Sequence, residues 1–140
     1  MEIYGDPEAD FEVERKADNS PLTIADRRAN DTICDMLAAT GLPILSEEIA
    51  AAPYETRAGW ERLWIVDPLD GTKEFIGRRD DFTVNIALVE RGVPVAGVVY
   101  LPVFGVLYVA MRGEGSFRID GVKPDIAVSL DELTGRGLRL

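Results

Sequence analysis

WIVDPLDGTKEF, residues 64–75, carries an apolar run directly into two aspartates, Asp67 and Asp70. Residues 63–66 have the apolar character of a buried strand, so we expect the two carboxylates at the end of that strand. A pair of acids in this place either caps a turn or holds something positive. Residues 71–76 follow as a short helix candidate, because a glycine comes directly after them.

The rest of the pattern predicts one α+β domain over residues 1–140, with helix and loops first and a mainly antiparallel sheet after them. A helix is expected over residues 23–39, with one apolar face made of Ala25, Ala29, Ile33, Met36 and Leu37. Strands are expected over residues 11–15, 43–45, 63–66, 82–89, 95–101, 106–111 and 115–119. The other segments are 17–21 (turn chemistry), 50–59 (loop or short helix) and 129–140 (no clear pattern).

Composition is that of a globular protein. The chain has 140 residues, of which 46% are hydrophobic and 29% charged, enough for one domain with a core. A net charge of −10 makes a nucleic-acid polymer an unfavourable partner, although a local cation site can still bind a small phosphorylated ligand. The chain has no histidine, so catalysis near neutral pH would depend on carboxylates or metal-activated water.

The compartment is inferred from the whole sequence. The single cysteine, Cys34, cannot form an internal disulfide, and its helical context predicts a small core residue. No apolar run approaches the roughly 18 residues of a membrane span, and no basic-then-apolar leader opens the sequence. We therefore expect a cytoplasmic protein without a transmembrane segment.

Three acids, Glu47, Asp67 and Asp70, follow or nearly follow apolar strands. Strands that lie side by side would bring these acids together, where they repel unless protons, basic groups or cations intervene. Mg²⁺ prefers oxygen ligands and is typically held by one or two carboxylates, waters and substrate phosphate oxygens. The pattern therefore fits a Mg²⁺ site.

The residues between and after the aspartates fit the same site. Pro68 fixes a bend, and Gly71 permits the backbone to come close to a ligand. The Leu69 carbonyl can turn inward as a neutral ligand. A helix that begins near Gly71 and Thr72 would offer its N–H groups to a phosphate.

Each acid also has an ordinary structural interpretation. Residues 67–72 can form a turn with an aspartate cap on the following helix. Glu47 and Glu48 can be a solvated acidic pair, and Asp26 can be a first-turn acid that interacts with the helix dipole. The residue pattern alone leaves both interpretations open.

Five segments carry a resemblance to a known family: KADNSPLTIAD at 16–26, LSEE at 45–48, WIVDPLDGTKEF at 64–75, FTVNIAL at 82–88 and GVVYLP at 97–102. The chain resembles the inositol monophosphatase superfamily of Mg²⁺-dependent, lithium-sensitive phosphatases, and is closest to its 3′(2′),5′-bisphosphate nucleotidases of the CysQ type. The Lys-Glu-Phe ending at 73–75, in place of an Asn-Phe ending, favours the nucleotidase branch.

The resemblance implies a set of metal ligands. Glu47, Asp67 and the Leu69 carbonyl would hold one Mg²⁺, and Asp67 and Asp70 would help to hold a second. Glu47 would also touch a third, looser ion.

The resemblance also implies catalytic and substrate-binding residues. Asp26 and Thr72 would orient and deprotonate the metal-bound water, which attacks phosphorus in line. The residues that would contact the substrate phosphate are Glu47, Leu69, Asp70, Gly71 and Thr72.

The resemblance covers the N-terminal half of the family fold, a layered α/β/α/β phosphatase about twice as long. The family's second half carries a Trp-Asp motif whose aspartate completes the second metal site. This motif is absent here, because the other tryptophan, Trp60, is followed by Glu61. We therefore interpret residues 1–140 as the metal-binding half: a truncated product, a chain completed by another subunit, or an incompletely represented chain.

Three functions remain in competition. The first is a Mg²⁺-dependent phosphatase that removes the 3′-phosphate of 3′-phosphoadenosine 5′-phosphate in sulfur metabolism. The second is an inositol- or sugar-phosphate monophosphatase. The third is an inactive half-domain that binds metal or a partner chain, either as a homodimer or with a complementing C-terminal half, because an exposed sheet edge and apolar patch would favour association.

Overall fold

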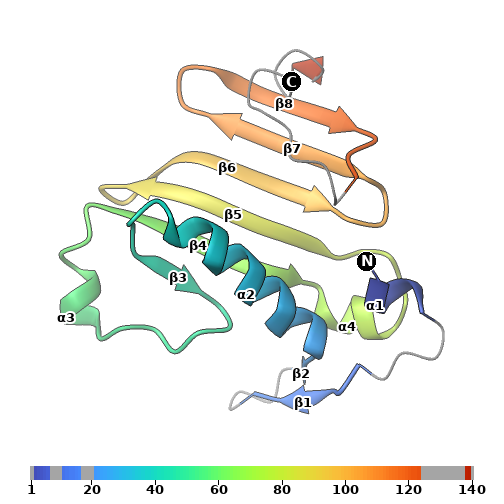
Figure 1. The fold of residues 1–140 in the computed structure, drawn as a ribbon. Helices are drawn as coiled ribbons and strands as arrows, with labels where there is room; N and C mark the ends of the chain where they lie inside the picture. The colour runs from blue at the N-terminus through green and yellow to red at the C-terminus, as the bar shows by residue number, and fades with distance from the viewer. Residues whose placement is uncertain (1, 7–10, 17–20, 124–137, 140) are drawn as a thin grey trace.

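A seven-stranded sheet, in the strand order β3-β4-β5-β6-β7-β8-β9, organises the computed structural model, which describes residues 2–6, 11–16, 21–123 and 138–139 (Figure 1). β3 and β4 run parallel, and each later pair of neighbours runs antiparallel. The predicted α+β class with a mainly antiparallel sheet is confirmed. The strands are β3 (Ile44–Ser46), β4 (Arg62–Asp70), β5 (Thr83–Glu90), β6 (Val93–Leu101), β7 (Val106–Met111), β8 (Gly115–Asp120) and β9 (Leu138–Arg139).

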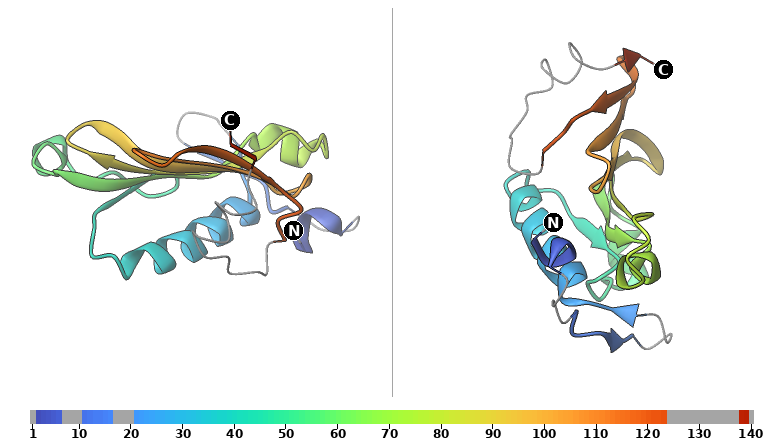
Figure 2. Two further views of the ribbon diagram at one scale, coloured as in Figure 1. Left: turned by 90° about the horizontal axis from the view of Figure 1, so that it is seen from above. Right: turned by 90° about the vertical axis from the view of Figure 1, so that its right-hand side faces the viewer.

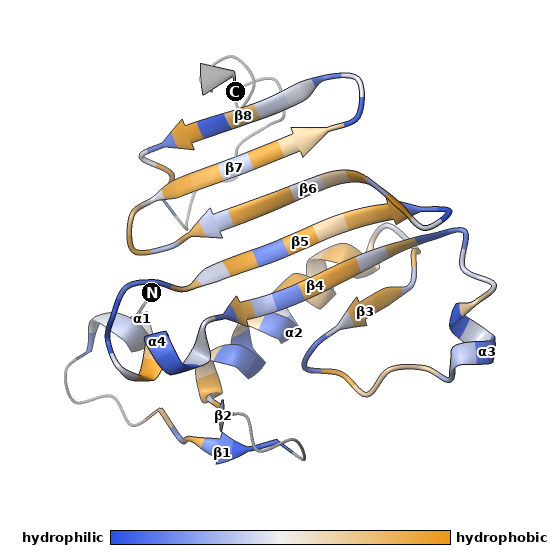
Figure 3. Cartoon of the chain, turned by 180° about the vertical axis from the view of Figure 1, so that it is seen from behind, coloured by the Kyte–Doolittle hydropathy of each residue, from blue (hydrophilic) through white to orange (hydrophobic). Residues whose placement is uncertain are grey.

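Short helices lie at both ends of the sheet, with α3 (Tyr54–Arg57) at one end and α1 (Glu2–Gly5) and α4 (Thr72–Ile76) at the other (Figure 1). The long helix α2 lies across one face, against β3 and β4 (Figure 2). The opposite face of β5 to β8 carries no helix of the described residues, and Figure 3 shows that β6 and β7 consist largely of hydrophobic residues. The helices and the remaining two-stranded sheet are α1 (Glu2–Gly5), α2 (Ile24–Ala38), α3 (Tyr54–Arg57), α4 (Thr72–Ile76), β1 (Glu14–Arg15) and β2 (Pro21–Leu22).

Helix α2 confirms the helix predicted over residues 23–39, and its start is set by a capping box. The Thr23 side chain accepts from the backbone N–H of Asp26, and the Asp26 carboxylate accepts from the backbone N–H of Thr23. The apolar face predicted for this helix is wrong at Met36, which is 74% exposed. The helix instead buries a polar column of Thr23, Asp26 and Asn30.

Two strand predictions needed correction. The strand expected over residues 11–15 is reduced to Glu14–Arg15, because Glu12 has a φ of +48° and interrupts the extended backbone. The strand expected over residues 63–66 does not stop before Asp67. β4 continues to Asp70, and its pairing register with β5 shifts between Asp67 and Asp70.

An aromatic cluster holds the end of β4 and helix α4 in place. Tyr4, Phe11, Leu69, Phe75 and Phe82 form one buried group. The ring centroids of Phe75 lie 5.1 Å from those of Tyr4, Phe11 and Phe82. Because Phe75 belongs to α4 and Leu69 to β4, this packing fixes the loop that joins the two elements.

Other sequence predictions have mixed outcomes. Cys34 is half-buried on α2, not part of the core cluster. Within the described residues, no helix is long and apolar enough to cross a membrane. Most of the predicted turn at 17–21 and most of the tail at 129–140 lie outside the described residues.

Candidate active site

The end of β4 carries the two aspartates of the WIVDPLDGTKEF stretch. Asp67 lies opposite Asn85 of β5, and Asp70 is the last residue of the strand. Asp67 Oδ1 accepts a hydrogen bond of 3.2 Å from the Leu69 N–H, two residues further on. One oxygen of Asp67 thus stabilises a local bend, but the predicted aspartate cap on the following helix is wrong, because the N-cap of α4 is Gly71 and no side chain of the described residues caps this helix.

The two residues predicted to be catalytic lie together. Thr72 Oγ1 donates a 3.1 Å hydrogen bond to Asp26 Oδ1, although 46 residues separate them. Thr72 Oγ1 also lies 3.3 Å from the Leu69 carbonyl oxygen. Asp26 is fully buried, and its other carboxylate oxygen accepts from the Thr23 N–H at 2.7 Å. The capping box of α2 thus fixes Asp26 with one oxygen and presents the second to Thr72.

Gly71 joins the strand to α4 in a conformation that only glycine adopts without strain. Its φ is +98°, and an added Cβ would stand 2.8 Å from the Asp81 carbonyl oxygen. The close approach of this carbonyl and the left-handed backbone together aim Thr72 toward Asp26. The sequence prediction of a short helix over residues 71–76 is confirmed by α4, which begins at Thr72.

Glu47 and Glu48 share a basic partner. Lys16 Nζ lies 2.8 Å from Glu47 Oε1 and 2.8 Å from Glu48 Oε1. Burial lowers the pKa of the Lys16 ammonium, but its hydrogen bonds to the two glutamates outweigh burial, and the pKa is raised overall. Burial also raises the pKa of Glu48 in spite of Lys16. The acidic pair is therefore not simply solvated, because a half-buried ammonium holds both members.

The pKa of Asp67 reflects its burial and the charges of the neighbouring acids at this end of the sheet. Burial, followed by the charges of Glu47 and Asp70, raises the pKa of the Asp67 carboxyl to about 6. The hydrogen bond from the Leu69 N–H lowers the pKa but does not offset these causes. The negative charges of Glu47, Asp67 and Asp70 are thus close enough to repel one another, and a cation among them would relieve that repulsion.

The donor chemistry fits a hard divalent cation. Carboxylates of Glu47, Asp67 and Asp70 and the carbonyl of Leu69 are all oxygen donors of the kind that Mg²⁺ prefers. Among the described residues, however, no three His, Cys, Asp or Glu side chains are arranged as a ready-made metal cage. One reason is visible at Glu47, whose Oε1 is held by Lys16.

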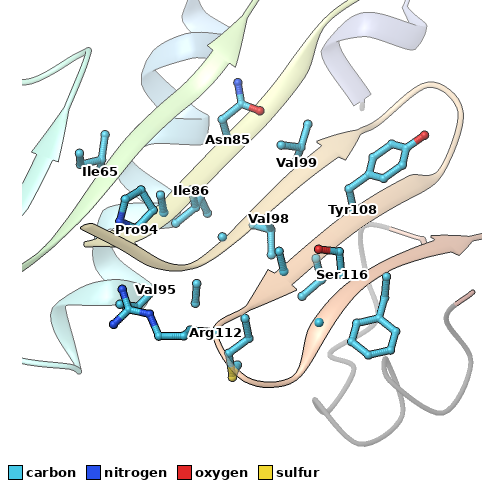
Figure 4. Close-up of a pocket in the computed structure, with 18 of the residues that line it drawn as sticks. Ile65, Asn85, Ile86, Pro94, Val95, Val98, Val99, Tyr108, Arg112 and Ser116 are labelled. Atoms are coloured by element: carbon cyan, nitrogen blue, oxygen red, sulfur yellow. The ribbon is translucent and has the colours of Figure 1, made fainter. Parts of the chain in front are cut away.

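Two residues that sequence reasoning left without a role also belong to this region. Lys16 neutralises the glutamates, and Asn85 Nδ2 lies 3.3 Å from Asp70 Oδ2. A polar residue in the apolar alternation of FTVNIAL was the available signal for Asn85. A hollow of about 990 Å³ lies over the open face of the sheet, which is the face opposite α2 (Figure 4). Asp67 and Asn85 are among the residues that line it.

Known proteins share both the sequence and the fold of this chain. The sequence profile of the inositol monophosphatase family matches residues 1–137. The chain belongs to this family. Within it, the 3′(2′),5′-bisphosphate nucleotidase CysQ of Escherichia coli strain K12 is 48% identical over 130 residues, which cover 91% of this chain and 52% of that protein.

Solved structures of the inositol monophosphatase family superpose on the chain. CysQ from Bacteroides thetaiotaomicron has 51% sequence identity and a TM-score of 0.85, and the match covers 99% of this chain and 51% of that one. Staphylococcal IMPase-I complexed with products has 30% identity and a TM-score of 0.66, with 84% and 44% of the two chains covered. The chain thus spans about half the length of the curated relatives it matches.

Proposed function

We propose that the chain supplies the metal-binding half of a Mg²⁺-dependent phosphatase that removes the 3′-phosphate of 3′-phosphoadenosine 5′-phosphate. The observation that carries this proposal is the Asp26–Thr72 hydrogen bond beside the acidic end of β4. It joins the two residues that the family resemblance makes responsible for activating water. The identity of 48% to a bisphosphate nucleotidase supports the nucleotide substrate over other phosphate esters.

The proposed cation site uses the oxygen donors of Glu47, Asp67, Asp70 and the Leu69 carbonyl. A divalent cation bound there would lower the pKa of water and neutralise charge on the phosphate. The carboxylates offset the cation's charge, and the mutual repulsion seen at Asp67 favours its uptake. In the same proposal, the substrate phosphate contacts Glu47, Leu69, Asp70, Gly71 and Thr72.

Asp26 and Thr72 form the proposed route for a proton. Because the Thr72 hydroxyl donates to Asp26 Oδ1, its lone pairs are free to accept from a water molecule. As that water attacks phosphorus, its proton would pass to Thr72 Oγ1 and the Thr72 proton to Asp26, while the bond between phosphorus and the 3′-oxygen breaks and the released oxygen takes a proton from solvent. Burial of Asp26 and its bond to the Thr23 N–H keep the acceptor oxygen in place. Positioned bases of this kind typically contribute about 10²- to 10⁴-fold to a rate.

Phosphate release from two substrates tests this proposal. 3′-Phosphoadenosine 5′-phosphate and inositol 1-phosphate are each incubated with the protein, with Mg²⁺ and with a chelator in its place. We expect release from the nucleotide to exceed release from the inositol ester and to stop when the chelator is present. Faster release from inositol 1-phosphate would replace the nucleotidase assignment with the monophosphatase one.

The same assay decides whether residues 1–140 act alone. We treat them as a single domain that corresponds to the N-terminal half of the family fold. Mg²⁺ binding without turnover of either ester would identify the chain as a half-domain that needs a complementing C-terminal half or a second copy. Release of phosphate that is insensitive to chelation would contradict a cation-dependent reaction altogether.

A further inference from the structure

Asn85 pairs with one aspartate of the proposed cation site across the strands and hydrogen-bonds the other, without being one of the proposed ligands. It pairs with Asp67 across β4 and β5, and its side chain lines the same hollow as Asp67. On its other side it pairs with Val99 of β6. The amide of Asn85 therefore lies on the open face of the sheet, with Asp67 on one side and Val99 on the other; Figure 4 shows Asn85 and Val99.

The amide of Asn85 is oriented by Asp70. Its Nδ2 donates to Asp70 Oδ2 at 3.3 Å. A flipped amide would turn its oxygen toward the carboxylate, where two acceptors would face each other without a proton between them. The charge of Asp70 therefore selects the orientation that is seen, and the hydrogen bond in turn limits the positions open to the Asp70 carboxylate.

This orientation leaves the other end of the amide without a partner. Asn85 Oδ1 is buried and accepts no hydrogen bond from the residues that the structure describes. In Figure 4 it lies on the side of Val99, whose methyl groups cannot donate. A buried acceptor without a donor destabilises the fold, and an apolar side chain of similar shape would avoid that cost. The amide thus contributes little to stability, which leaves its bond to Asp70 as the reason for its presence.

We propose that Asn85 is a positioning residue that holds the Asp70 carboxylate in place for the divalent cation. The inference rests on the proposed function, because it presumes that Asp70 is a ligand. Partners that orient ligands from outside the first coordination shell typically change metal affinity by about 10- to 100-fold when they are replaced. Asn85 acts on the cation indirectly in the same way, through its hydrogen bond to Asp70.

The experiment compares two Asn→Leu substitutions in the 140-residue chain. For Asn85→Leu we expect the affinity for Mg²⁺ alone, measured by titration calorimetry, to fall about 10- to 100-fold. The melting temperature of the metal-free variant is expected to stay the same or rise, because the unpaired oxygen is gone. Asn30→Leu is the matched control, since Asn30 Oδ1 accepts 2.6 Å from Ser46 Oγ and neither residue is a proposed ligand. The control should melt lower and keep its Mg²⁺ affinity.

The outcomes separate this inference from the proposed function. Unchanged Mg²⁺ affinity in Asn85→Leu would overturn the positioning role and leave the cation site standing. A lowered melting temperature together with lowered affinity would overturn it too, because a purely structural residue behaves in that way. If the leucine variant does not fold, Asn85→Ala decides by the same two measurements. A wild-type chain that binds no Mg²⁺ would overturn both proposals.

Discussion

Two polar regions lie close to β4, and they differ in how completely their groups are paired. Beneath α2, Asp26 accepts from Thr23 and Thr72, and Asn30 Oδ1 accepts from Ser46 Oγ. All of these side chains except Thr72 are buried. Buried polar groups that are satisfied in this way specify one arrangement of helix and sheet.

In the region at the end of β4, by contrast, the polar groups lack favourable partners. The pKa of Asp67 is raised to about 6 by burial and by neighbouring acids, and Asn85 Oδ1 is buried without a donor. Such unfavourable features concentrate where a protein binds a ligand, because the ligand relieves them. Under the proposed function, the paired region holds Asp26 in place, and the unpaired region is where a cation would relieve unfavourable contacts.

The largest effect is expected for Asp67→Asn, which tests the contrast between the two polar regions. Removing one charge from the proposed cation site should lower turnover of the bisphosphate nucleotide by about 1000-fold or more, the effect of roughly 4 kcal/mol in the transition state. The metal-free variant should melt at the same or a higher temperature, because a repelled carboxylate is gone. Steady-state kinetics and thermal unfolding without metal measure the two effects. Parallel losses of fold and activity would show that Asp67 belongs with the paired region.

Thr72→Ala tests where the two regions meet, since this hydroxyl links Asp26 to the end of β4. We expect turnover to fall about 100-fold through loss of the proton route. Mg²⁺ affinity should change much less. Thr72→Ser keeps the hydroxyl and should retain most of the turnover. Equal activity of the alanine and serine variants would remove Thr72 from the chemistry.

Asn30→Leu probes the paired region directly. It leaves the buried Ser46 hydroxyl without its acceptor, so the free energy of unfolding should fall by about 1–3 kcal/mol. A double-mutant cycle with Ser46→Ala should return a coupling of about 0.5–1.5 kcal/mol, read from urea unfolding. A coupling near zero would mean that this hydrogen bond does not support the fold.

The smallest effect on function is expected for Lys16→Met. The ammonium holds Glu47 and Glu48 at 2.8 Å each and competes with any other cation for Glu47. Without it, Mg²⁺ affinity measured by calorimetry should rise a few-fold. The metal-free protein should lose stability, because the Glu48 side chain is only 6% exposed and would be left buried without its ammonium partner. Weaker Mg²⁺ binding in this variant would show that Lys16 organises the site instead of competing for it.

Local signals predicted the elements, and the family resemblance predicted the meeting of Asp26 with Thr72. Helix α2 was predicted from the spacing of its apolar residues and α4 from the glycine that directly follows it, because both signals lie within or next to the element. The Asp26–Thr72 bond joins residues far apart in sequence, so periodicity alone could not reveal it.

The features that sequence reasoning missed depend on the packing of distant segments. The pairing of Lys16 with both glutamates joins a loop to the end of β3, and the orphaned Asn85 oxygen depends on its neighbours in β4 and β6. The continuation of β4 past Val66 arises from pairing with β5, which tolerates a shift in register after Asp67. None of these features produces a periodic pattern of residues in the sequence.

Gly71 has a consequence for anyone who wishes to redesign the substrate preference of this protein. A side chain at this position would collide with the Asp81 carbonyl, and it would also strain the backbone, whose φ is +98°. Saturation libraries that include position 71 would therefore return mostly misfolded clones, whatever ester is used for selection. Substitutions are better made at neighbours whose side chains face solvent, such as Lys73, while Gly71 is left unchanged.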